Sequence, residues 1–276
     1  MKILSSALAF VLIAGGIALP AEAQAESSAT ESDSAAAAQA PSAADDAAQA
    51  NNPLAAFTAF NIHNYYVPKI SESDGTSNTF WLRYAQPFGR WLMRASLPTM
   101  RVPTVADEST SGLGDLNVFL AYLLKTGNPA RSFGIGPQLT APTATEDETG
   151  AGKWQGGFAT VFFDASSKRF QWGALLTWQT SFAGNDDRAD TSVLAFQPFY
   201  MLQLGKGFYA RGVPIMVFNL ETNDYAIPYG LGLGKVISTP KIVYNVFVEP
   251  QFTILDRGPG QPQLQIFFGF NLQFKK

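Results

Sequence analysis

The chain has 276 residues, of which 15% are charged and 13% aromatic. Soluble domains average roughly 25% charged residues, so part of the exterior is expected to face something other than water. With 19 Lys and Arg against 22 Asp and Glu, the net charge of −3 leaves no basic excess for nucleic-acid binding. The absence of cysteine excludes disulfides and thiol catalysis, and a single histidine makes a histidine metal site or catalytic pair hard to build. We therefore expect no catalytic residue, no metal and no cofactor.

The N-terminal region is typical of a secretory signal peptide. Lys2 precedes an apolar stretch that ends near Leu19, and Ala21 and Ala23 form a small-x-small cleavage pattern. The alternative, an uncleaved membrane anchor, needs an apolar span of about 20 residues. The pattern predicts a signal peptide over residues 1–23 and an exported mature chain.

Residues 24–52 form a second region, which is rich in Ala and Ser. This stretch is acidic and contains no aromatic residue, no Lys and no Arg. Such a composition cannot bury enough apolar surface to offset the entropy of ordering the chain. We expect a disordered spacer here, followed by one domain over residues 53–276.

That domain alternates between apolar and polar residues with a period of two, as β-strands do. In 263-QLQIFFGFNLQF-274 every second residue is apolar, and the opposite face is mostly polar. The lengths match the roughly 9 to 11 residues that a tilted strand needs to cross a bilayer. The predicted fold is an all-β, transmembrane, antiparallel up-and-down β-barrel of about 12 strands. The segments lie at about 57–67, 79–87, 90–98, 115–124, 132–141, 154–164, 170–182, 191–204, 208–218, 226–236, 241–254 and 263–274.

The connections between these segments alternate in length and in charge. Outer-membrane barrels have short periplasmic turns and longer outer loops. The long connections here carry most of the acidic residues, and the short ones carry Lys and Arg, so the long ones are expected outside. The long connections are predicted at about 68–78, 99–114, 142–153, 183–190, 219–225 and 255–262.

Several stretches resemble a family of Gram-negative outer-membrane barrels, the MetA-pathway of phenol degradation family, whose members are often mislabelled as neuromedin U. The resemblance covers about residues 53–276, and its most specific piece is 134-GIGPQLTAPTATEDETGAGKW-154. Further matching pieces are 111-SGLGDLNVFLAY-122 and 228-PYGLGLGKV-236. The resemblance implies an outer-membrane barrel with an uptake role, and it implies no particular substrate.

The inward faces of the predicted strands supply the candidate functional residues. A two-residue turn at Phe88-Gly89 would set Arg83 directly opposite Arg94, and two like charges so placed need counter-charges. Asp115 and Glu249 could supply them and narrow the lumen, or the arginines could favour anionic solutes. A register shift by one would instead place both arginines in lipid. The lumen-lining candidates are Arg83, Arg94, Asp115, Asn117, Phe119, Phe247, Glu249, Gln251 and Phe267.

Three other features invite a catalytic or ligand-binding interpretation. His63 could belong to a lipase, but no serine follows it within its strand, so a structural or interfacial role is favoured. The acidic clusters at 146–148 and 186–190 lack a calcium-loop spacing and are expected to be solvated outer loops near lipopolysaccharide phosphates. The glycine strings at 150–153 and 230–235 lack a phosphate-loop ending, and the glycines at 230, 232 and 234 are expected to allow sheet curvature or to leave lumen space.

The sequence as a whole predicts a protein of the Gram-negative outer membrane. The leading hypothesis is a passive channel or uptake barrel for small, partly apolar or aromatic solutes. A closed structural or surface-interaction barrel and an outer-membrane hydrolase are the alternatives. The expected partners are outer-membrane lipid, lipopolysaccharide and, through the C-terminal strand, the barrel-assembly machinery, with no nucleic acid.

Overall fold

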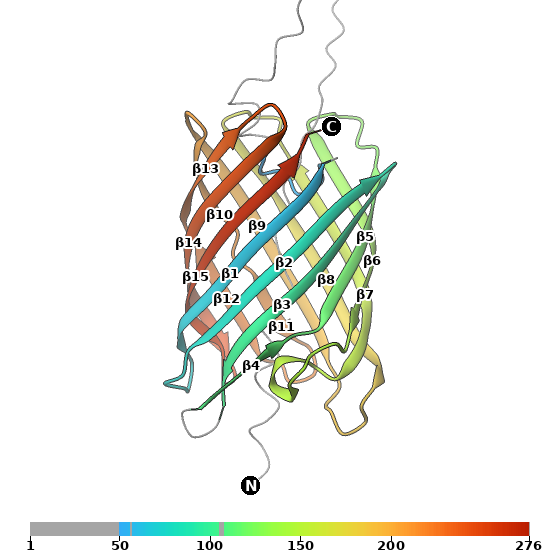
Figure 1. Ribbon diagram of the computed structural model, residues 1–276, viewed down its shortest axis with the longest axis vertical. Helices are drawn as coiled ribbons and strands as arrows, with labels where there is room; N and C mark the ends of the chain where they lie inside the picture. Colours follow the sequence, from blue (N-terminus) through green and yellow to red (C-terminus); the bar gives the residue numbers. More distant parts are fainter. Residues whose placement is uncertain (1–49, 56, 105–107, 276) are drawn as a thin grey trace, which may run out of the picture.

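A computed structural model describes residues 50–55, 57–104 and 108–275 of the chain, which form a closed antiparallel barrel (Figure 1). The predicted signal peptide and most of the predicted spacer lie outside the described residues. Three of the twelve barrel strands are each divided into two pieces, β4 with β5, β10 with β11 and β12 with β13. The strands are β1 (Thr58–Ile70), β2 (Ser77–Phe88), β3 (Trp91–Pro103), β4 (Ser109–Leu113), β5 (Leu116–Leu124), β6 (Arg131–Ala141), β7 (Lys153–Asp164), β8 (Phe170–Gly184), β9 (Ser192–Gly205), β10 (Phe208–Gly212), β11 (Met216–Asn219), β12 (Tyr225–Gly230), β13 (Gly232–Ser238), β14 (Ile242–Arg257) and β15 (Pro262–Phe274).

Neighbours in sequence are neighbours in the barrel, and the first and last strands close it. β1 pairs with β2 on one side and with β15 on the other, where Thr58 lies opposite Phe274. Closure removes the exposed sheet edges that an open sheet would present to lipid. The predicted up-and-down barrel of about 12 strands is therefore confirmed.

The outer surface of the barrel is apolar because the outward face of nearly every strand carries large hydrophobic side chains. Aromatic pairs follow this face across neighbouring strands near the short turns, with ring centroids 4.9 Å apart for Trp91 and Tyr122 and 5.4 Å apart for Phe162 and Trp172. Aromatic rings at this level form the girdle that outer-membrane barrels place at the lipid–water interface. Exposed side chains on this surface include Phe60, Phe80, Leu82, Ile135, Phe158, Trp172, Val246, Phe252 and Phe268.

The strands extend beyond the lengths predicted from the sequence, so the connections are shorter than expected. β8 and β14 span 15 and 16 residues, more than the roughly 9 to 11 that a bilayer requires. The difference in length between long loops and short turns is therefore smaller than predicted. The connection over 142–152 remains the longest and contains a short 3₁₀ helix, Asp147–Thr149. Within the described part of the chain, no helix is long and apolar enough to cross a membrane.

The register between β2 and β3 differs from the predicted one. Phe88 pairs with Trp91, so the turn residues are Gly89 and Arg90, and Arg83 lies opposite Ser96 instead of Arg94. Gly89 has φ +59°, a left-handed conformation that suits glycine at the first central position of a two-residue hairpin turn. The predicted direct opposition of Arg83 and Arg94 is wrong. The shift moves the pairing by two residues, which leaves both arginines on the inward face.

The barrel wall bends inward where β10 ends. Residues 211–215 are all buried, so the alternation of inward and outward side chains is lost there. Pro214 lies in this segment and lacks the N–H that a strand ladder needs. β10 pairs with β13 up to Arg211, and β11 pairs with β12 only from Val217. Among the described residues, 212–216 therefore make no ladder pairs with 227–231.

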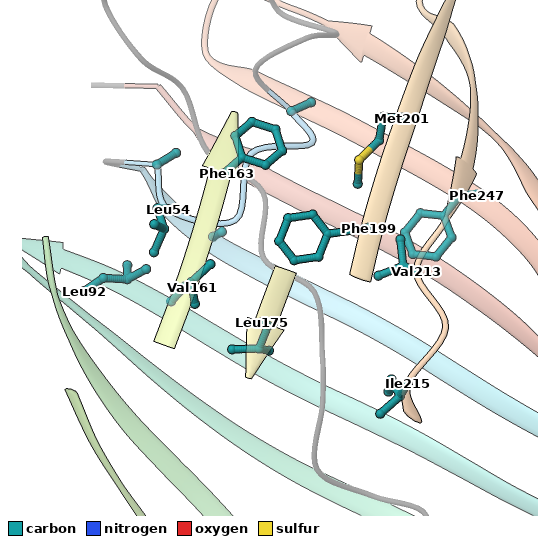
Figure 2. Close-up of a cluster of buried hydrophobic side chains, with 14 of the residues drawn as sticks. Leu54, Leu92, Val161, Phe163, Leu175, Phe199, Met201, Val213, Ile215 and Phe247 are labelled. Atoms are coloured by element: carbon teal, nitrogen blue, oxygen red, sulfur yellow. The ribbon is translucent and has the colours of Figure 1, made fainter. Parts of the chain in front are cut away.

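The interior of the barrel is filled by side chains and by a short piece of chain. Figure 2 shows Leu54 among apolar side chains that include Val161 and Phe163 of β7, Leu175 of β8 and Phe199 of β9. Residues 50–55, which we name the inner segment, are buried inside the barrel just before β1. Ala50, Asn51 and Asn52 belong to the stretch that the sequence assigned to the spacer. The candidate site is therefore the region between the inner segment and the inner wall.

Candidate functional site: the interior of the barrel

Side chains of β14 and β15 donate hydrogen bonds to the inner segment. Asn245 of β14 donates through Nδ2 to the Ala50 carbonyl at 3.3 Å and to Asn51 Oδ1 at 3.1 Å. Gln273 Nε2 donates to the same Ala50 carbonyl at 3.4 Å. Leu54 packs into the apolar cluster, and its own N–H donates to Asn52 Oδ1 at 3.0 Å. Among the described residues, the inner segment thus joins the wall through apolar packing and side-chain hydrogen bonds, and not through a strand ladder.

A cavity of about 20 Å³ lies between the inner segment and the wall. Asn51 and Pro53 line it from the inner segment, and His63, Arg211 and Phe199 are among the wall residues that line it. This volume is about the size that one water molecule occupies. A solute could use this space only if the inner segment moved.

Aromatic rings and arginines gather around His63 on the wall formed by β1, β14 and β15. The His63 ring lies 5.2 Å from Phe267 and 5.7 Å from Phe247, both in edge-on contact. Tyr65 stacks on Phe267 with centroids 4.1 Å apart, and the Arg211 guanidinium lies 3.5 Å from the Phe247 ring. Two predicted lumen-lining aromatics, Phe247 and Phe267, therefore meet in one cluster. Flat rings beside cations provide both stacking and charge for a bound solute.

Glu249 pairs with Arg211 rather than with the arginines that the sequence suggested. Arg211 Nε donates to Glu249 Oε2 at 2.8 Å, and both side chains are buried. Glu249 Oε1 accepts the Val213 N–H at 2.7 Å and Gln251 Nε2 at 2.7 Å. Gln197 Nε2 donates to the Val213 carbonyl at 3.1 Å. The carboxylate thus holds the inward bend of the wall, because it satisfies a backbone N–H that no strand partner reaches.

Arg83 and Arg94 both lie inside the barrel and contact aromatic rings. The Arg83 guanidinium lies 4.5 Å from the Trp81 ring, and that of Arg94 lies 4.5 Å from the Phe119 ring. Arg83 Nη1 donates to His63 Nδ1, so the protonated ring nitrogen is Nε2, which donates to Asn271 Oδ1 at 2.8 Å. This arrangement fixes one tautomer of a neutral imidazole.

The remaining predicted lumen residues take different places. Asp115 lies at the break between β4 and β5, and its carboxylate accepts the N–H groups of Ala144 and Ala151 at 3.1 and 2.8 Å. It therefore anchors the 142–152 loop and does not face Arg83 or Arg94 in an ion pair. Asn117 donates to Thr140 Oγ1 at 2.9 Å on the inner wall. Gln251, besides its bond to Glu249, accepts from Gln265 Nε2 at 2.7 Å.

Sequence reasoning missed three residues of this interior. Arg211 and Tyr65 lie on inward positions of predicted strands, so the same alternation that selected Glu249 could have selected them. Asn245 also lies on an inward position, but nothing in its own strand indicates that it binds residues 50 and 51. The residues that these two hydrogen bonds join are 195 and 194 positions apart in the sequence, so the contact depends on the path of the chain inside the barrel.

The other sequence features have structural roles among the described residues. His63 bonds to Asn271 and Arg83, and no serine hydroxyl bonds to it there. Basic residues form ion pairs with the acidic loops: Arg188 lies 3.3 Å from Asp147, and Lys153 lies 3.2 Å from Asp190. The glycines of 230–235 make room for large inward side chains.

Gly234 shows this need for space most clearly. A Cβ at Gly234 would lie 2.2 Å from the Tyr209 ring, and one at Gly230 would lie 2.5 Å from Glu249 Oε1. Both distances are too short for any non-bonded contact, so only glycine fits beside these buried groups. The Tyr209 ring and the Glu249 carboxylate fill the space beside these two glycines, so that space is not open lumen.

Comparison with known proteins identifies the family. The profile of the MetA-pathway of phenol degradation family matches residues 33–195, which is more than half of the chain. The chain belongs to this family. No curated protein matches this family member by sequence.

Two solved structures place the fold among outer-membrane barrels. The COG4313 outer membrane channel from Pseudomonas putida F1 is 15% identical with a TM-score of 0.60, over 79% of this chain and 96% of that chain. The NanC porin is 11% identical with a TM-score of 0.51, over 79% of this chain and 100% of that chain. At such identities the likeness concerns the fold. This member of the phenol degradation family is thus an outer-membrane β-barrel, as its apolar outer surface also requires.

Proposed function

We propose that the protein is a passive uptake channel for small, partly apolar or aromatic solutes, and that the inner segment closes the channel in this structure. The observation that carries the proposal is the contrast between a wall whose strands are joined by ladders over most of their length and an inner segment that, among the described residues, no ladder joins to the wall. Strand ladders fix the wall, whereas the inner segment contributes contacts of 3.1 to 3.4 Å to Asn245 and Gln273. The part of the interior that is easiest to displace is therefore the part that blocks the lumen.

The character of the interior supports this class of solute. Phe119, Phe247 and Phe267 are buried inside the barrel, together with Asn117, Gln251 and Gln265. Aromatic faces with a few polar groups are typical of sites for small apolar molecules. The family is described by the degradation of phenol, which supports an aromatic solute in particular.

A closed structural barrel is the second candidate, and the inner segment is also the observation that favours it. If the inner segment never leaves the lumen, the barrel transports nothing, and its role would lie at its surface. The two candidates differ in whether solute enters vesicles that contain the protein.

The test is liposome swelling with phenyl glucoside, a neutral aromatic solute that crosses lipid slowly, with glucose as the polar comparison. We expect the full chain to speed phenyl glucoside entry above that of protein-free liposomes, and above that of glucose. The double variant Asn51→Ala/Leu54→Ala should speed it further, because losing a packed leucine destabilises the closed arrangement by about 2 to 5 kcal/mol. Asn185→Ala, in the connection between β8 and β9, is the control and should leave the rate unchanged. Equal swelling with and without protein, for the native chain and the double variant, would refute the proposed channel.

A further inference from the structure

Arg83 and its neighbours present buried hydrogen-bond donors that have no acceptor. Arg83 Nε and the Ser96 hydroxyl are buried, and neither has a hydrogen-bond partner among the described residues. Ser96 lies directly opposite Arg83 in the β2–β3 ladder. The Tyr65 hydroxyl lies within hydrogen-bonding reach of the Arg83 guanidinium and can accept from it, while no acceptor among the described residues takes the Tyr65 O–H. Buried polar atoms are nearly always satisfied, so several orphans in one place call for a ligand or ordered water.

The charge of this group points to an anion. Arg83 carries a positive charge and is only 2% exposed. No carboxylate of the described residues forms an ion pair with it, since Glu249 is engaged by Arg211 at 2.8 Å. His63 accepts a hydrogen bond from Arg83 and so contributes no negative charge. A buried cation without a counter-charge is strongly disfavoured, and an oxyanion that accepted from the free donors would remove that penalty.

The surroundings of the three donors are aromatic. Trp81 lies 4.5 Å from the guanidinium of Arg83, and Phe267 stacks on Tyr65 at 4.1 Å. Flat apolar walls beside a cation suit a solute whose carboxylate is attached to a ring or to another compact apolar group. An inorganic anion would satisfy the donors but would gain nothing from these rings, which Arg83 and Tyr65 cover in this structure.

We propose that Arg83, Tyr65 and Ser96 form a binding site for the carboxylate of a small aromatic or apolar acid, with its apolar part against Trp81 and Phe267. The inference deepens the proposed function and rests on it, because a solute must enter the lumen to reach this site. Arg83 provides the charge and a planar pair of donors, and the two hydroxyls provide the remaining hydrogen bonds. The site therefore indicates that the interior selects small aromatic or apolar acids.

The test is calorimetric binding to the full chain in detergent after long equilibration, with benzoate and its neutral isostere benzamide. We expect benzoate to bind at least about tenfold more tightly than benzamide, because a charge-assisted hydrogen bond to a buried partner contributes about a decade in affinity. Arg83→Gln should bring benzoate down to the level of benzamide, and Arg83→Lys should recover part of the loss. Tyr65→Phe should weaken benzoate several-fold and leave benzamide unchanged. Arg101→Gln removes an exposed arginine of β3 and should have no effect.

Folding of each variant is checked by its heat-dependent mobility on gels, and Tyr65→Phe carries the test if Arg83→Gln does not fold. Equal binding of benzoate and benzamide, no binding of either, or full benzoate affinity in both Arg83→Gln and Tyr65→Phe would overturn the proposal. Chloride or acetate competing as well as benzoate would also overturn it, because the apolar part would then contribute nothing. Phenyl glucoside is neutral, so the swelling test does not depend on this site. If phenyl glucoside enters the liposomes but benzoate binds no more tightly than benzamide, only the proposed site is refuted. If benzoate binds more tightly but phenyl glucoside does not enter, only the proposed channel is refuted.

Discussion

Replacing Glu249 with glutamine should destabilise the barrel more than any change at an exposed ion pair. Glu249 is fully buried and joins Arg211 at 2.8 Å, Val213 N at 2.7 Å and Gln251 Nε2 at 2.7 Å. Glutamine can keep the oxygen that accepts from Val213 N and Gln251, but its amide nitrogen would then face the guanidinium of Arg211. The variant therefore loses the carboxylate that, among the described residues, pairs with this cation, and it sets two hydrogen-bond donors against each other.

The expected loss follows from burial. Removing one partner of a buried ion pair costs about 3 to 5 kcal/mol, because the other charge is left buried and unpaired. The Arg131–Asp164 pair has the same 2.8 Å geometry, with the Arg131 side chain 50% exposed and that of Asp164 9% exposed. Asp164 keeps the hydrogen bond from Ser166 N when Arg131 is replaced, and pairs with a solvent-exposed partner contribute about 0 to 1 kcal/mol. Arg131→Gln is therefore a matched control that should lose at least about 2 kcal/mol less than Glu249→Gln.

The assay is urea unfolding of the barrel refolded in lipid vesicles, followed by tryptophan fluorescence. The double variant Arg211→Gln/Glu249→Gln should lose less stability than the sum of its single variants, because it leaves no buried charge unpaired. A loss for Glu249→Gln no larger than that for Arg131→Gln would refute the reasoning, since the pair would then be solvated or dispensable.

Two further predictions concern the register and the loops. Since the chain has no cysteine, the pair Tyr84→Cys/Ala95→Cys should form a disulfide faster than Tyr84→Cys/Met93→Cys, and the reverse order would contradict the register. The hydrogen bond from Lys153 holds the pKa of the Asp190 carboxyl below its ordinary value of 3.8. The contact is therefore fully present at a pH above 3.8 and is lost as the pH falls through the lowered pKa. Carbon NMR titration should show the pKa of Asp190 rising in Lys153→Gln, and an unchanged value would count against the contact.

The alternation of side chains predicted the barrel well because a period of two is a local property of each strand. Each strand from β1 to β15 overlaps a predicted segment except β4, which lies in the connection predicted over 99–114, and the inward positions of Arg83, Arg94 and Glu249 follow from that period. Which end of the barrel faces outward, the signal peptide, the binding of lipopolysaccharide and recognition by the assembly machinery stay predictions.

The partners of the inward residues could not be predicted in the same way. The register of β2 and β3 depends on whether the turn begins at Phe88 or Gly89, and one residue in the turn moves every pair by two positions. The pairing of Glu249 with Arg211 depends on the inward bend at Val213, which breaks the period. The position of the inner segment depends on packing inside a closed barrel, for which no local pattern exists.

Solute entry with the inner segment locked in place shows whether this segment closes the channel. In the variant Asn51→Cys/Asn245→Cys, a reducible thiol cross-linker can join the two positions, whose side chains lie 3.1 Å apart in the native chain. We expect phenyl glucoside entry into liposomes to fall to the protein-free level when the link is present and to return when the link is reduced. Entry that is equally fast with and without the link would contradict the claim that the inner segment closes the channel.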